Sequence, residues 1–248
     1  MPTTTHLTTV HDPDFSTQEL LAATGSISPN VNRLLVALIY VESAPGMANV
    51  RASGNGLTWT LSAQDSTSFD GNEFYCLTAP TGGSPSAGAV TVEWDTDPGN
   101  VWNVSIYEID GADMVSPILS DATVGNANPG SPFCTFAGTT AGSTILGLCR
   151  RFNNSTNIVP PTGYTEDAEA DIPGSARGYE VCHLDNAGAT TTLTWGASNP
   201  DSLAYAVEVK AGGYIPVPPP WPYGGGGAKS DRVSPTRRTR QTQPIQGG

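Results

Sequence analysis

Two glutamates, Glu108 and Glu208, are the residues of this 248-residue chain that most resemble a catalytic pair. Glycosidases cleave sugar bonds with two carboxylates that lie about 5 to 10 Å apart. Both glutamates, however, occupy the same place in a duplicated pattern, Val104–Ile109 (VSIYEI) and Ala204–Val209 (AYAVEV). Duplication alone explains why the glutamate recurs, so we expect the two side chains to lie far apart. The sequence therefore predicts no catalytic residues and a protein that is not an enzyme.

Oxygen ligands at short spacing occur on one turn, where Asp95, Asp97 and Asn100 are a weak candidate calcium site. Asp-rich turns are also common because Asp hydrogen-bonds to its own backbone, and the turn lacks the EF-hand spacing. The three histidines are too scattered for zinc. We therefore expect no metal and no cofactor. A second acidic group is expected in a solvated loop: Glu166, Asp167, Glu169 and Asp171.

Exposed aromatic side chains in a row would allow stacking on sugar rings. Trp59, Trp94 and Trp195 end or interrupt strand-like segments at places set by the duplicated pattern. Such positions favour core packing. Trp102 follows a turn that is expected to be exposed, so it is the residue on which a sugar-binding role would depend.

The C-terminal segment offers a different kind of contact. Residues 214–223 read YIPVPPPWPY, a polyproline-type rod, and a tetraglycine and a basic stretch follow. A stiff rod loses little entropy on binding, so its aromatic residues can anchor in a neighbour's pocket. We expect this arm to bind a partner through Trp221, Tyr223, Lys229, Arg232, Arg237, Arg238 and Arg240.

The elements that would carry these residues are strands. Segments with β-branched or aromatic alternation recur between Gly, Pro, Asn and Asp clusters, without intervening helical periodicity. The stretch 34–39 (LLVALI) is apolar throughout, which predicts a central strand covered on both faces. We expect an all-β antiparallel sandwich of about ten strands: Leu34–Glu42, Leu57–Gln64, Asn72–Ala79, Ala89–Trp94, Val101–Asp110, Phe133–Ala137, Ser143–Phe152, Gly178–Leu184, Thr190–Trp195 and Leu203–Lys210.

Five segments occur twice in the same order, about 100 to 110 residues apart. Residues 87–94 (AGAVTVEW) are echoed by 187–195 (AGATTTLTW), and Cys76 is matched with Cys182. Duplicated strand-built halves pack to bury a common core. The sequence therefore predicts a sandwich made of two pseudo-symmetric repeats.

Changes in composition set the expected boundaries. Residues 1–23, polar and Thr-rich, are predicted to form an N-terminal arm. The sandwich is expected over 24–211, with repeat halves at about 24–112 and 133–211. Residues 212–248 form the Pro/Gly-rich basic C-terminal arm.

Charge is segregated along the chain. Five Lys or Arg residues and one Asp give residues 229–248 a charge of +4, which leaves −16 for residues 1–228 of a chain whose total is −12. An acidic body repels nucleic acid and anionic membranes, so neither is expected as a partner. No run of 18 apolar residues and no signal-peptide pattern occurs, so we expect synthesis in the cytoplasm.

Several short stretches together carry a resemblance to a known type of protein. Residues 24–30 (TGSISPN), 33–37 (RLLVA), 56–60 (GLTWT) and 106–112 (IYEIDGA) follow one another in this order. The region of about 20–211 resembles a jelly-roll-like β-sandwich module of phage virion proteins and related bacterial surface proteins. The resemblance brings no catalytic residues with it.

The resemblance implies a structural role in a bacteriophage virion, as a capsid decoration (cement) protein or head fibre made in the host cytoplasm. The implied partners are the major capsid protein or other virion subunits, and the implied state is a homo-oligomer. A carbohydrate-binding or adhesin module of a phage tail, fibre or bacterial surface is the alternative. Exposed aromatics on one face would distinguish the alternative from the structural role.

Overall fold

The computed structural model describes ten stretches of the chain: residues 1–12, 20–42, 49–65, 72–95, 101–124, 131–152, 158–172, 177–189, 192–196 and 202–213. Within them the chain forms fifteen β-strands, and every strand pairing is antiparallel. No helix in this part of the chain is long and apolar enough to cross a membrane.

The first half of the chain builds a five-stranded sheet in the order β1-β8-β3-β6-β5. At its centre is β3, which pairs with β8 on one side and β6 on the other. The edges are β1 and β5. The strand bounds are β1 Thr3–His11, β3 Leu34–Glu42, β5 Thr60–Asp65, β6 Asn72–Pro80 and β8 Val101–Asp110.

The second half builds an equivalent sheet in the order β9-β15-β11-β13-β12. Its central strand, β11, pairs with β15 and β13 in the same way that β3 pairs with β8 and β6. The bounds are β9 Ile118–Val124, β11 Ser143–Arg151, β12 Thr165–Asp171, β13 Gly178–Ala187 and β15 Ser202–Val209.

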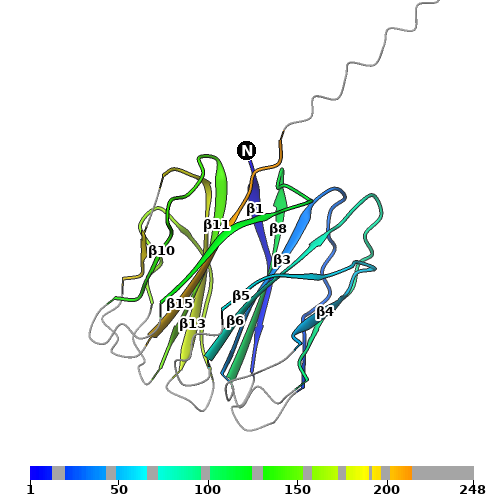
Figure 1. Cartoon of the computed structure of the whole chain (residues 1–248). Helices are drawn as coiled ribbons and strands as arrows, with labels where there is room; N and C mark the ends of the chain where they lie inside the picture. Colours follow the sequence, from blue (N-terminus) through cyan, green and yellow to red (C-terminus); the bar gives the residue numbers. More distant parts are fainter. Residues whose placement is uncertain are drawn as a thin grey trace, which may run out of the picture. The chain divides into compact units, whose positions relative to one another are not determined.

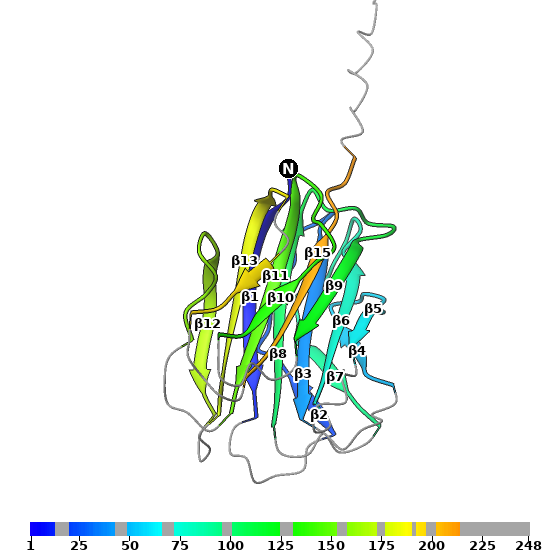
Figure 2. The same cartoon turned by 60° about the vertical axis from the view of Figure 1, so that its left-hand side comes forward.

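Each half also has a small sheet. The first has three strands in the order β2-β7-β4, namely Leu21–Ala23, Val90–Glu93 and Arg51–Gly54. The second has two, β10 (Phe133–Thr135) and β14 (Thr192–Thr194). Figures 1 and 2 show the two large sheets facing each other, with β4 beside the first and β10 beside the second.

The two halves share register as well as strand order. Leu35 lies opposite Glu108 in the first half, and Ile145 lies opposite Glu208 in the second. The edge strands β5 and β12 even have an irregularity at the same place, between their second and fourth residues. Trp94 directly follows β7 and Trp195 directly follows β14, so these two residues lie at equivalent positions.

The match of Cys76 with Cys182 is wrong by one residue. Leu38 lies opposite Cys76, whereas its counterpart Leu148 lies opposite Val181. A slip of one position turns a strand side chain to the other face of the sheet. Accordingly, Cys76 belongs to the core between the two large sheets, and Cys182 belongs to the core under the second small sheet.

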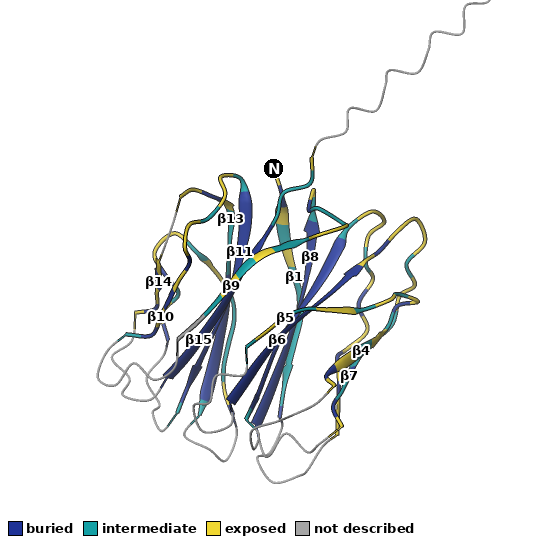
Figure 3. Cartoon of the chain, viewed as in Figure 1, coloured by how far each residue is buried: buried dark blue, intermediate teal, exposed yellow. Residues whose placement is uncertain are grey.

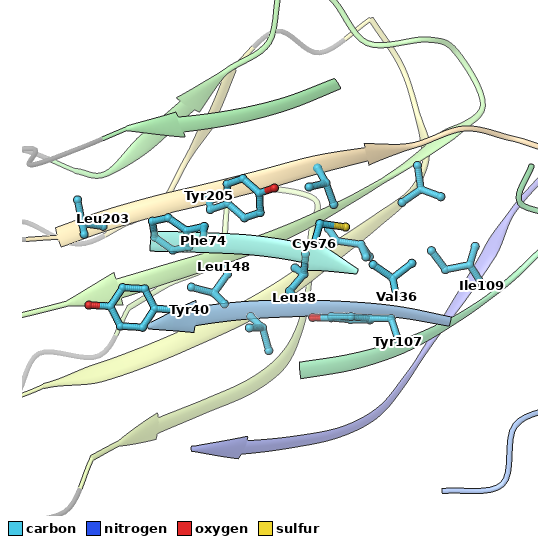
Figure 4. Close-up of a cluster of buried hydrophobic side chains, with 14 of the residues drawn as sticks. Val36, Leu38, Tyr40, Phe74, Cys76, Tyr107, Ile109, Leu148, Leu203 and Tyr205 are labelled. Atoms are coloured by element: carbon cyan, nitrogen blue, oxygen red, sulfur yellow. The ribbon is translucent and has the colours of Figure 1, made fainter. Parts of the chain in front are cut away.

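Three cores separate the sheets. The central core lies between the two five-stranded sheets, where the rings of Phe74 and Tyr205 stack with centroids 5.1 Å apart (Figure 4). The other two cores lie between each large sheet and its small sheet, around Trp94 and Trp195. Buried residues are therefore concentrated in the two large sheets, as Figure 3 shows.

The apolar run of β3 reflects its position between two cores. Leu34, Val36, Leu38 and Tyr40 point to the central core, and the residues between them point to the first outer core. Eight of its nine residues are buried. The prediction of a central strand covered on both faces is confirmed.

The expected all-β antiparallel architecture is confirmed, but its details differ. The described residues form fifteen strands where ten were expected, and four sheets where a sandwich of two was expected. The segment 1–23, interpreted as an arm, contributes β1 and β2 to these sheets. The additional strands are short or lie at sheet edges, where side chains are half-buried and the apolar alternation is weak.

Candidate functional site

The predicted partner-binding residues of the C-terminal arm lie outside the described residues. All seven, from Trp221 to Arg240, fall within residues 214–248. Their role stays a prediction.

Glu108 and Glu208 perform the same structural task in the two halves. Glu108 accepts hydrogen bonds from the backbone N–H of Asn30 at 2.6 Å and from its side-chain amide at 2.7 Å. Glu208 accepts from the backbone N–H of Thr140 at 2.5 Å and from the Ser120 hydroxyl at 2.9 Å. Both carboxylates are buried and hold the loop that leads into the central strand.

The two glutamates point away from each other. Their neighbours along the strands, such as Tyr107 and Val207, face the central core, so the glutamates face the two outer cores. Facing sheets lie about 10 Å apart, and both large sheets lie between the two carboxylates. Because glycosidase carboxylates must flank a single bond, Glu108 and Glu208 cannot act as such a pair.

Four tryptophans belong to the body, and all four contribute to the outer cores. Trp94 and Trp195 are buried, and Trp59 packs half-buried against the first outer core. Trp102 was expected beside an exposed turn, but it is only 4% exposed and contacts Trp94 with ring centroids 6.0 Å apart. The expectation fails because Trp102 is the second residue of β8 and points under the small sheet. The described residues thus contain no row of exposed tryptophans.

The candidate calcium turn is only partly described. The Asp95 carboxylate binds the Arg51 guanidinium at 2.5 Å and the Asn49 amide at 2.7 Å, and these two partners lower its pKa. Asp97 and Asn100 lie outside the described residues. Across the described stretches, no group of three or more His, Cys, Asp or Glu side chains could hold a metal ion.

The acidic segment expected as a loop is the edge strand β12. Its Asp171 forms an ion pair with Arg151, whose side chain crosses Gly178 of the intervening strand β13. A Cβ at Gly178 would lie 2.3 Å from the Arg151 Nε, so only glycine leaves room for this crossing. Glu169 accepts the backbone N–H of Ile158 at 2.9 Å. Pairing to β13 therefore orders the segment despite its charge.

Glu180 on β13 is a fully buried carboxyl group in the second outer core. It lies opposite Cys149 on one neighbouring strand and Glu169 on the other. Burial raises the pKa of Glu180 to about 8; Glu169 and Glu166 add to the rise, and Cys182 and Trp195 oppose it. The side chain is therefore protonated at neutral pH, which avoids a buried charge.

A polar cluster joins β1 of the first half to β13 of the second. Asp185 accepts hydrogen bonds from the Thr4 backbone N–H at 2.9 Å and from the Thr4 hydroxyl at 2.6 Å. His183 Nδ1 lies 2.9 Å from both carboxylate oxygens of Asp167. Burial lowers the pKa of His183, but Asp167 and Asp185 outweigh burial and the net shift is upward.

The two halves also meet near the start of β13, at the opposite end of this strand from Asp185. There the central core contains a buried cation. Arg150 is fully buried and donates to the backbone carbonyls of Arg151 at 2.7 Å and Gly178 at 2.8 Å. Its guanidinium lies over the ring of Tyr40, 5.2 Å from the centroid, and 3.6 Å from the Glu42 carboxylate. Glu42 belongs to the first half, so this contact fastens the two halves together.

The small sheets differ in one respect that affects the surface. In the first half β7 has β2 on one side and β4 on the other. In the second half β14 pairs only with β10 among the described residues. On the other side of β14, the Gly196 N–H donates to the Val159 carbonyl at 2.8 Å, and Ile158 donates its N–H to Glu169 of β12 at 2.9 Å.

Comparison of the chain with protein-family models, with curated proteins and with solved structures finds no match. Sequence reasoning missed the His183–Asp167 pair and buried Arg150, because strand pairing and packing, and no short motif, bring these residues to their partners. The shorter connection before β12 is visible in the sequence: Glu42 and Trp59 are 17 positions apart, whereas Phe152 and Tyr164 are only 12 apart.

Proposed function

We propose that this chain is a non-enzymatic structural protein of a bacteriophage particle, most specifically a capsid decoration protein fastened to its neighbours through residues 212–248. The observation that carries the proposal is the division between a densely packed all-β body and a separate basic, Pro-rich segment. Particle proteins commonly fasten to neighbours by extended segments, because such segments cover much surface with few residues. The resemblance of residues 20–211 to phage virion modules supports the same role.

The positions of the side chains that could have served in catalysis or sugar binding support a structural role. Glu108 and Glu208 are occupied with loop backbone groups. Trp94, Trp102 and Trp195 fill outer cores. These assignments favour a particle protein over a sugar-binding module, whose stacking surface needs exposed rings.

We further infer that the body is a fused pseudo-dimer. Equivalent residues of the two halves, such as Leu38 and Leu148 or Ile109 and Val209, meet in the central core. Self-complementary contact between equivalent faces is the arrangement that a two-fold axis produces. Superposition of the halves in an experimental structure tests this inference, and equivalent strands that fail to superpose would contradict it.

Charge suggests how the arm binds. The body carries −16 and residues 229–248 carry +4, so the basic end of one copy is attracted to the acidic body of another. Each exposed ion pair contributes only about 0 to 1 kcal/mol. Trp221 and Tyr223 should therefore supply most of the binding free energy, while the arginines add steering and salt sensitivity.

The test is to delete residues 212–248 and measure occupancy on purified particles by quantitative mass spectrometry. The truncated protein should fold, with an unchanged far-ultraviolet spectrum, but lose particle association. A second variant replaces Trp221 and Tyr223 by Ser and keeps every charge. It should lose most of the binding, because the aromatic side chains supply most of the binding free energy. Full occupancy by the folded, truncated protein would contradict the proposal.

A further inference from the structure

One end of the body is formed by turns that two buried glutamates hold in place. The strands β3 and β11 begin at this end, and β8 and β15 finish there. Glu108 on β8 binds Asn30 in the turn before β3, and Glu208 on β15 binds Thr140 in the turn before β11. A surface with a fixed backbone loses little conformational entropy on binding. This end is therefore suited to contact with another protein.

Both ends of the described chain lie at the same end of the body, as Figure 1 shows. Thr3 lies opposite Asp110, the last residue of β8. Gly212 donates its N–H to the Gly111 carbonyl at 2.7 Å, so the chain leaves the body here. The Pro-rich residues 214–223 follow at once, and a polyproline rod of that length spans about 30 Å. A neighbour held by the aromatic residues of this rod must therefore lie within about 30 Å of this end.

The charged side chains in the turns of this end cancel. Arg33 forms an ion pair with Asp110 at 2.8 Å, and Lys210 forms one with Asp113 at 2.7 Å. The other described turns here contain no Asp, Glu, Lys or Arg: 24–32, 55–59, 81–89, 136–142, 161–164 and 188–189. The centre of a protein interface is depleted in charged residues. A neutral end on a body that carries −16 is thus the surface that electrostatic repulsion opposes least.

Three apolar side chains project from this neutral surface. Met1 is 87% exposed, Val31 is 49% exposed and Val115 is 90% exposed. Val31 follows Asn30 in the turn that Glu108 holds. The Val115 N–H donates to the Asp113 carboxylate at 2.8 Å, which fixes the turn after β8. Single exposed apolar residues are common on proteins, but three on one fixed, uncharged end have the composition of an interface.

We propose that this end of the body, which we call the terminal face, lies against the shell of the particle and forms a second contact beside the arm. The terminal face consists of Met1 and the turns 28–33, 111–117 and 138–142. Its partner is an uncharged, partly apolar protein surface. The shell fits better than a second copy, because two such faces in contact would have to let both arms leave between them. This inference rests on the proposed function, in which the arm fastens the protein to the particle.

Two pairs of substitutions in the full-length protein test the terminal face. Val31→Glu with Val115→Glu places two charges on it. The matched control is Leu20→Glu with Val159→Glu, because both side chains are 54% exposed and both lie beside the small sheets. Each protein is added to particles assembled without it, and quantitative mass spectrometry measures the bound amount against concentration. The first pair should bind about tenfold more weakly, since the contact then has to bury unpaired carboxylates. The control should bind like the unchanged protein.

Hydroxyl-radical footprinting of the unchanged protein gives a readout that needs no variant. Met1, Val31 and Val115 should become about threefold less reactive on the particle than in solution, because the contact excludes water from them. Leu20 and Val159 should keep their reactivity. Far-ultraviolet spectra of the variants check that each one folds, and the footprint decides the question if one does not.

Two results would overturn the inference. Equal binding by the two pairs, or unchanged reactivity of the terminal face on the particle, would mean that the arm alone holds the body. A dimer in analytical ultracentrifugation that protects the same face would assign the face to a second copy. In either case, loss of particle binding on deletion of residues 212–248 would leave the proposed function standing. Failure of the unchanged full-length protein to bind particles would contradict the proposed function itself.

Discussion

Glu180→Gln should make the protein more stable at neutral pH. Burial raises the pKa of this carboxyl from 4.5 to about 8. Between these values the unfolded chain ionises while the folded chain holds the proton, so stability falls as pH rises from 4.5 and levels off above 8. At pH 7 the cost is about 3 kcal/mol, from about 2.5 pH units at about 1.4 kcal/mol each. The amide has no such cost.

The expected gain is smaller than the full cost, because the new amide N–H groups also need partners in a buried site. We expect Glu180→Gln to gain about 1 to 2 kcal/mol at pH 7, or a few degrees in Tm for a domain of this size. At about pH 4.5 the gain should vanish, because the glutamate is protonated in both states. Urea denaturation at both pH values measures the difference. Asp121→Asn, at an exposed carboxyl on β9 that does not act on Glu180, is the control and should change little. A Glu180→Gln effect that does not depend on pH would refute the reasoning.

Four further substitutions test the loop contacts of the two glutamates and the side-chain contacts around β13. Glu208→Ala and Glu108→Ala should each cost about 1 to 3 kcal/mol, since each removes two hydrogen bonds to a buried carboxylate, and a large difference between them in urea denaturation would argue against equivalent roles. His183→Gln should cost more stability at about pH 6 than at about pH 8.5. A histidine whose pKa is raised by folding stabilises the protein below its unfolded-state pKa, and this stability is lost as pH rises through the folded-state pKa. Thermal melts at both pH values check the sign. Gly178→Ala should cost about 1 to 3 kcal/mol, because the new methyl group displaces the Arg151 side chain, and a calorimetric Tm equal to that of the unchanged protein would contradict it.

The central strands were predictable because two cores impose a strong pattern. The apolar run of β3 predicts a doubly covered central strand, and the paired segments with their tryptophans identify the duplicated arrangement from sequence. The missed strands β1, β9 and β12 are edges, and β1 and β12 have mostly intermediate burial and polar or acidic residues. Local alternation is weak at an edge, and pairing to the neighbouring strand decides the structure there instead.

The site was less predictable than the fold. The equivalent roles of Glu108 and Glu208 followed from their places in the repeat. The expectation that Trp102 is exposed was wrong, because a residue beside a turn can still be the second residue of a buried strand. The Cys76–Cys182 match failed because matching residue types outweighed a one-position difference in register. Partners such as Asp167 and His183 meet only through strand pairing, which short-range sequence patterns do not encode.

The number of copies of this chain on purified phage particles tests the central claim most directly. Quantitative mass spectrometry of particles from a phage that carries the gene, after washes in detergent and nuclease, gives its ratio to the major capsid protein. A structural decoration role predicts a fixed copy ratio to the major capsid protein, equal to one or to a simple fraction. It also predicts that high salt releases the protein and that a chain without residues 212–248 does not bind. Absence from washed particles, or a trace amount that varies between preparations, would contradict the claim.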